Sequence, residues 1–251
     1  MYTSSELVNS QGDPDKSTSY ATGFAQLAVP RVLRVVQVVP GSAEASPATA
    51  ARSAIDDQVL RLFAMISEGL AGATDAFLSE DRDQARALVA ADQAVDSLQA
   101  DIEGLINAEL DARAAPTATT IRALVGILII VLELERSGDL VEHIALRTAQ
   151  GMAASLSPHA RGLIQQMGDA GVQMWRQAAV AYAHHDVLAA DRLRSLDDRL
   201  DDLHVSLGAE LAQCVISVPV AIEMGLVARF LERLGDHAVN VARRIAELPP
   251  G

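Results

Sequence analysis

Four pairs of carboxylates spaced four residues apart stand out, because this spacing places both acids of a pair on one face of a helix. A like-charge pair there costs about 0.2–0.5 kcal/mol, so a metal ion, a basic side chain or protonation should compensate for it. Clustered carboxylate oxygens suit Mg²⁺, Ca²⁺ and Mn²⁺, and iron when carboxylates bridge two ions. The pattern therefore indicates candidate multinuclear metal sites. The pairs are Asp92 with Asp96, Glu135 with Asp139, Asp197 with Asp201, and Glu232 with Asp236.

The acidic pairs occur twice on a repeated framework. A shift of 105 residues superposes Asp92 on Asp197 and aligns further acidic and apolar residues around them. A shift of 97 residues superposes 134–139 (Leu-Glu-Arg-Ser-Gly-Asp) on 231–236 (Leu-Glu-Arg-Leu-Gly-Asp). This self-similarity indicates an internal duplication.

Helical periodicity from Ser53 onward predicts six helices in two groups of three. We expect an all-α fold of two tandem three-helix bundles, 51–153 and 154–248, after a disordered tail at 1–50 that is rich in Ser, Thr, Gly, Pro and Ala. The predicted helix starts carry residues typical of N-terminal caps. They are Ser53 with Asp56, Asp81 with Gln84, Pro116 with Thr117, Ser157 with Pro158, Asp186, and Ser217 with Pro219.

The helix face on which each acid lies indicates whether the acid points toward the core or toward solvent. On a helical wheel, Glu135 and Asp139 continue an apolar stripe that includes Ile121, Leu124 and Val131, so both acids are predicted to point toward the core. A buried carboxylate without a partner is costly and must be neutralised by a proton, a basic side chain or a metal. For the second-helix pairs a solvent-facing position stays open, because Asp-rich segments such as 197–202 often face water.

Neighbours of the acids add two expectations. Gly138 and Gly235 lie inside predicted helices, where Gly costs roughly 1 kcal/mol against Ala, which indicates close backbone packing beside the acids. Arg136 and Arg233 follow the motif glutamates and could pair with a neighbouring helix or a dimer partner. The histidines are expected to be structural or solvated.

Composition narrows the class of protein. Hydrophobic residues make up 50% of the 251 residues and aromatics only 3%, which favours helices. A formal charge of −13 argues against nucleic-acid binding. A single cysteine, Cys214, excludes an intramolecular disulfide and favours a reducing compartment. With neither a secretory signal nor about 20 uninterrupted apolar residues, we expect a cytoplasmic protein that reaches membranes only through partners.

The segments 134–139 and 231–236, the second continued by Asp-His-Ala-Val-Asn at 236–240, closely resemble the signature of the PhoU family. That signature is Glu or Asp, three residues, then Asp, within tandem three-helix bundles. The resemblance covers about residues 53–247, and Ser137 stands at a position that is usually apolar in the family.

The resemblance implies a cytoplasmic, typically dimeric accessory protein that binds multinuclear iron, zinc, manganese or magnesium. It implies action between a phosphate ABC transporter and a sensor histidine kinase, with negative regulation of phosphate uptake and of the phosphate-starvation response. The metal ligands that it implies are Glu135, Asp139, Glu232 and Asp236, supported by Asp92, Asp96, Asp197 and Asp201.

Three functions compete at this point. The first is a regulatory metal-binding protein without catalysis. The second is a carboxylate-bridged di-metal enzyme or metal store, although such sites use Glu-x-x-His on two helices and this sequence contains no such motif. The third is a helical scaffold whose acids are protonated or paired with arginine. The sequence also lacks a Gly-rich phosphate loop, a Cys-x-x-Cys and a His-Glu-x-x-His motif.

Overall fold

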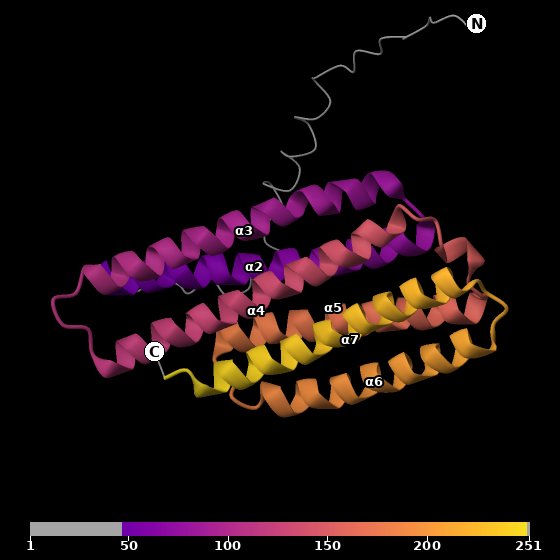
Figure 1. Ribbon diagram of the computed structural model, residues 1–251. Coiled ribbons are helices and arrows are strands. Elements are labelled where there is room, and N and C mark those ends of the chain that lie inside the picture. The colour runs from indigo at the N-terminus through magenta and orange to yellow at the C-terminus, as the bar shows by residue number, and fades with distance from the viewer. Residues whose placement is uncertain (1–46, 250–251) are drawn as a thin grey trace, which may run out of the picture.

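The computed structural model describes residues 47–249, which form six α-helices and one short 3-10 helix (Figure 1). Within that range there is no strand, which confirms the all-α prediction. None of the helices in this part of the chain is long and apolar enough to cross a membrane. Most of the predicted tail, residues 1–46, lies outside the described residues. The elements are α2 (Pro47–Ser79), α3 (Arg82–Asp111), α4 (Ala118–Thr148), η2 (Ala153–Ser155), α5 (Pro158–His184), α6 (Ala189–Gln213) and α7 (Val218–Glu247).

Three predicted caps are confirmed. The Asp81 carboxylate accepts hydrogen bonds from the backbone N–H groups of Asp83 and Gln84 at the start of α3. The hydroxyls of Thr117 and Ser157 accept in the same way at the starts of α4 and α5. Each cap satisfies a backbone N–H that has no partner within the helix.

Two predicted helix starts are wrong. Helix α2 already begins at Pro47, so Ser53 lies inside it, and Asp56 pairs with Arg52 at 2.9 Å instead of closing a cap. Helix α6 begins at Ala189 rather than at Asp186. The Asp186 carboxylate accepts a hydrogen bond from the Leu188 N–H at 2.9 Å within the preceding turn.

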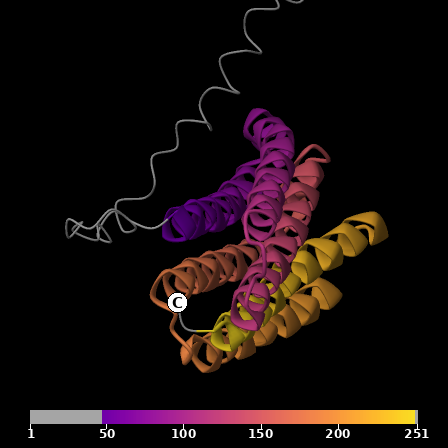
Figure 2. The ribbon, with the colours of Figure 1, turned by 90° about the vertical axis from the view of Figure 1, so that its left-hand side faces the viewer.

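The six helices form two groups of three. Helices α2, α3 and α4 pack against one another, as do α5, α6 and α7, and the groups meet where α2 packs on α5 and α4 packs on α7. Helices α3 and α6 lie at opposite edges of the molecule (Figure 1). In the turned view, the orange and yellow C-terminal group lies largely below the indigo and magenta N-terminal group (Figure 2).

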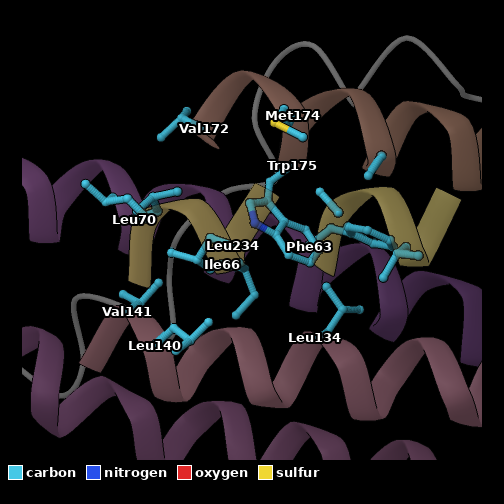
Figure 3. Close-up of a cluster of buried hydrophobic side chains, with 14 of the residues drawn as sticks. Phe63, Ile66, Leu70, Leu134, Leu140, Val141, Val172, Met174, Trp175 and Leu234 are labelled. Atoms are coloured by element: carbon cyan, nitrogen blue, oxygen red, sulfur yellow. The ribbon is translucent and has the colours of Figure 1, made fainter. Parts of the chain in front are cut away.

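A shared core joins the two groups. Phe63 of α2 and Trp175 of α5 are fully buried with ring centroids 6.1 Å apart. Leu134 of α4 and Leu234 of α7 approach the same cluster (Figure 3). The Tyr182 hydroxyl donates to Asp56 at 2.6 Å and ties α5 to α2. Because each third helix has a side chain in this core, α4 and α7 are held side by side.

Candidate metal centres

The first carboxylate cluster lies between α3 and α4. Burial, followed by the negative charges of Glu142, Asp96, Asp139 and Glu135 in that order, raises the pKa of Asp92 from 3.8 to about 6. Burial, Asp139 and Asp96 likewise raise the pKa of Glu135. Groups that shift one another in this way lie close together. The structure therefore gathers the two acidic pairs of the first half into one site.

The second cluster repeats this arrangement between α6 and α7. Burial, followed by the negative charges of Asp236, Asp201, Glu232 and Asp198, raises the pKa of Asp197 from 3.8 to about 6. Two buried oxygens of this cluster, Asp197 Oδ1 and Glu232 Oε2, have no hydrogen-bond partner in the described part of the chain. Buried carboxylate oxygens without partners are costly, and a cation would satisfy them.

The two motif glycines allow this packing, as predicted. A Cβ on Gly138 would lie 3.4 Å from Asp92 Oδ1 and 3.2 Å from a methyl of Val95. A Cβ on Gly235 would lie 2.6 Å from Asp197 Oδ1, too close without a shift of one helix. The aspartates of the second helices thus sit over the backbone of the third helices.

The orientation predicted for the third-helix acids is only partly right. Glu232 is buried, but Glu135 and Asp139 are half-buried and Asp236 is exposed. On the same stripe Leu124 and Val131 are buried, whereas Ile121 at the start of α4 is 42% exposed, so the stripe faces the core along only part of its length. Asp92 and Asp197 are half-buried between helices, whereas Asp96 and Asp201 are exposed. The solvent-facing alternative, which was left open for the second-helix pairs, therefore holds for Asp96 and Asp201.

The clusters also contain charges that the duplication did not reveal. Glu142 acts on Asp92 more strongly than the other carboxylates do. It lies three residues after Asp139, so helical spacing could have identified it. At the second cluster Arg229 forms an ion pair with Glu232, and the shift of 97 residues puts Leu132 at the matching position of α4. The second cluster therefore contains an arginine paired with a motif glutamate, which the matching position of the first cluster does not provide.

Arg136 lies 3.6 Å from Glu133 of its own helix, so the predicted pairing with a neighbouring helix is not observed for this residue. Pairing with a dimer partner stays a prediction. Ser137, the unusual motif residue, contacts His237 Nδ1 at 3.0 Å across the α4–α7 contact. A polar residue at this position thus has a buried polar partner.

Carboxylate oxygens dominate both clusters, a set that fits hard cations and carboxylate-bridged metals. At the second cluster His204 also acts on Glu232. Within residues 47–249, no three His, Cys, Asp or Glu side chains are already drawn together at metal-binding separations.

Fold and site together define a class, an all-helical protein of two three-helix groups with an acidic cluster between the second and third helix of each. The family model of the PhoU domain matches residues 59–148 and 164–245. The chain belongs to the PhoU family.

Individual relatives agree with this assignment. The chain is 32% identical over 204 residues to a phosphate-specific transport system accessory protein PhoU homolog 2 of Mycobacterium tuberculosis, covering 77% of this chain and 95% of that protein. It is 30% identical over 182 residues to a PhoU homolog of Aquifex aeolicus, covering 70% and 81%. The crystal structure of PhoU from Pseudomonas aeruginosa has the same fold, with a TM-score of 0.72 at 24% identity over 79% of this chain and 97% of that one.

Proposed function

We propose that this chain is a non-enzymatic accessory protein of phosphate transport that binds multinuclear metal ions through its two carboxylate clusters. The observation that carries the metal assignment is the convergence of carboxylates on Asp92 and Asp197, the pKa of each of which is raised to about 6 by burial first and then by these neighbouring charges. A divalent ion relieves both the repulsion among these acids and the desolvation of the buried oxygens. Iron, zinc, manganese and magnesium are the metals to test.

The proposed ligands follow from this arrangement. Glu135 and Asp139 would hold metal at the first cluster, and Glu232 and Asp236 at the second. The second-helix acids Asp92, Asp96, Asp197 and Asp201 would complete the two sites.

The proposed regulatory role rests on the family. The relatives are named as accessory proteins of the phosphate-specific transport system. We propose that a cytoplasmic homodimer contacts the ATPase of a phosphate ABC transporter and a sensor histidine kinase. Through both contacts it would restrain phosphate uptake and the starvation response.

Elemental analysis of the natively purified protein tests the metal assignment. We expect bound metal in the wild type and its loss in a variant carrying Glu135→Gln, Asp139→Asn, Glu232→Gln and Asp236→Asn. A matched control removes four exposed charges elsewhere, through Asp57→Asn, Asp75→Asn, Asp101→Asn and Asp111→Asn, and should retain the metal. Equal metal content in all three proteins would place the ions elsewhere, and absence of metal after reconstitution would contradict the proposal.

Two further assays test the proposed transporter contact and the proposed absence of catalysis. Co-purification with the transporter ATPase, weakened in the four-ligand variant and kept in the control, would support a metal-dependent contact. Turnover of phosphoesters that depends on Glu135 would contradict the non-enzymatic role.

A further inference from the structure

A basic cavity lies on the α4–α7 contact, beside the acidic clusters. It has a volume of about 250 Å³, and three arginines, Arg136, Arg147 and Arg233, line it together with His143 and His237. Three guanidinium groups around one small cavity are notable in a chain with a net charge of −13. The cavity is therefore suited to a small anion.

Arg147 is held in position before any ligand arrives. Its guanidinium carbon lies 4.7 Å from the centroid of the Phe230 ring, a cation–π contact. One of its terminal nitrogens donates to the His143 carbonyl at 2.7 Å. Its Nε lies 3.0 Å from Glu223 of α7. These contacts reduce the entropy that a ligand would have to remove from the side chain.

The other two arginines are less well compensated. Arg136 and Glu133 are 3.6 Å apart, which is too long for a hydrogen bond. Arg233 is half-buried, and in the described part of the chain it forms no ion pair with a carboxylate. Charged groups withdrawn from water are normally paired. The guanidinium of Arg233 thus lacks the counter-charge that the other two possess.

His237 is buried at the α4–α7 contact, where its Nδ1 lies 3.0 Å from the Ser137 hydroxyl and 3.8 Å from Glu133. Arg136 of α4 and Arg233 of α7 line the same cavity as this imidazole, so guanidinium groups from two helices border one space. An imidazole can donate or accept a hydrogen bond at the cavity wall.

We propose that this cavity binds a tetrahedral oxyanion of the phosphate class, as the free ion or as the phosphoryl group of a small phosphomonoester. Arginine forks match phosphate oxygens in pairs, and three arginines can reach such an anion from several sides. A planar carboxylate is satisfied by one fork and would leave the others unused. Asp139 also lines the cavity, and its negative charge opposes the anion.

Isothermal titration calorimetry of the full chain with inorganic phosphate tests the site, in EDTA so that phosphate cannot bind through a metal ion. We expect Arg233→Gln to weaken binding by at least about tenfold, as removal of a charge-assisted hydrogen bond does. Arg243→Gln changes the net charge equally at an exposed position of the same helix and should stay within about twofold of the wild type. Equal weakening by both variants would overturn the proposal, because it would reduce the effect to net charge.

For a second variant we expect the opposite change in phosphate affinity. Asp139→Asn removes the opposing carboxylate and should strengthen phosphate binding several-fold, whereas Asp111→Asn, an exposed control on α3, should leave it unchanged. The same titrations with AMP distinguish the two sources of the anion. Arg233-dependent binding of phosphate assigns the free ion, and Arg233-dependent binding of AMP alone assigns a phosphomonoester. Binding of neither ligand, or weaker binding by Asp139→Asn, would overturn the proposal.

Discussion

Replacing Asp197 by Asn is expected to stabilise the metal-free protein near neutral pH. In the folded protein the pKa of Asp197 rises from 3.8 to about 6, chiefly through burial and then through the charges of Asp236, Asp201 and Glu232. The folded state therefore binds the proton more tightly than the unfolded state does. The stability linked to this proton is fully present below about pH 4 and is lost as the pH rises through 6. Asn is neutral and similar in shape, so it avoids the loss.

The size of the effect follows from the pKa. At 1.36 kcal/mol per pKa unit, a rise from 3.8 to about 6 corresponds to about 3 kcal/mol. Because Asp197 remains partly exposed, screening by water reduces this to about 1–1.5 kcal/mol. The gain should be complete at pH 7.5, about half as large at pH 5, and close to zero below pH 4. The corresponding rise in melting temperature is roughly 3–6 °C.

Urea denaturation in EDTA measures the difference directly. Trp175 is the only tryptophan of the chain and is fully buried, so its fluorescence reports on the core. Asp101→Asn removes an exposed charge from α3 and should change the free energy of unfolding by less than about 0.5 kcal/mol at both pH values. A destabilised Asp197→Asn, or a gain that does not shrink between pH 7.5 and pH 5, would refute the electrostatic reading of the second cluster.

Two further substitutions test the packing that positions the sites, both by urea denaturation. Gly235→Ala should cost about 1–3 kcal/mol, because its Cβ would lie 2.6 Å from Asp197 Oδ1. Gly208→Ala in open space on α6 should gain up to about 1 kcal/mol, and equal stability of these two variants would argue against close packing at Gly235. Tyr182→Phe removes the hydrogen bond to Asp56 and should cost about 1 kcal/mol; an unchanged free energy of unfolding would mean that this bond contributes nothing to joining α5 and α2.

Local signals in the sequence located the helices well. The starts at Asp81, Thr117 and Ser157 were predictable because a cap joins a side chain to a backbone N–H only two or three residues away. The start of α2 was missed because Ser53 and Asp56 have the spacing of a capping box in the middle of a helix. There Asp56 has other partners, Arg52 and the distant Tyr182.

The acidic pairs were visible in the sequence, but their environments were not. Spacing of four residues put Glu135 and Asp139 on one face, whatever that face contacts. How deeply Asp92 is buried depends on the approach of α3 to Gly138, which brings Glu142 near as well. Arg229 near Glu232 lies outside the duplicated motif and makes the two clusters unequal.

By itself, the sequence determined the helical class, the duplication and the residue types that could hold cations. Helix periodicity, caps and motif spacing depend on residues that are neighbours along the chain, so they can be read without a fold. Only the tertiary structure decided which carboxylates are desolvated and that Arg136 and Arg147 of α4 share a cavity with Arg233 of α7. Desolvation and electrostatic fields sum over neighbours in space, and here those neighbours come from segments roughly 40 to 100 residues apart.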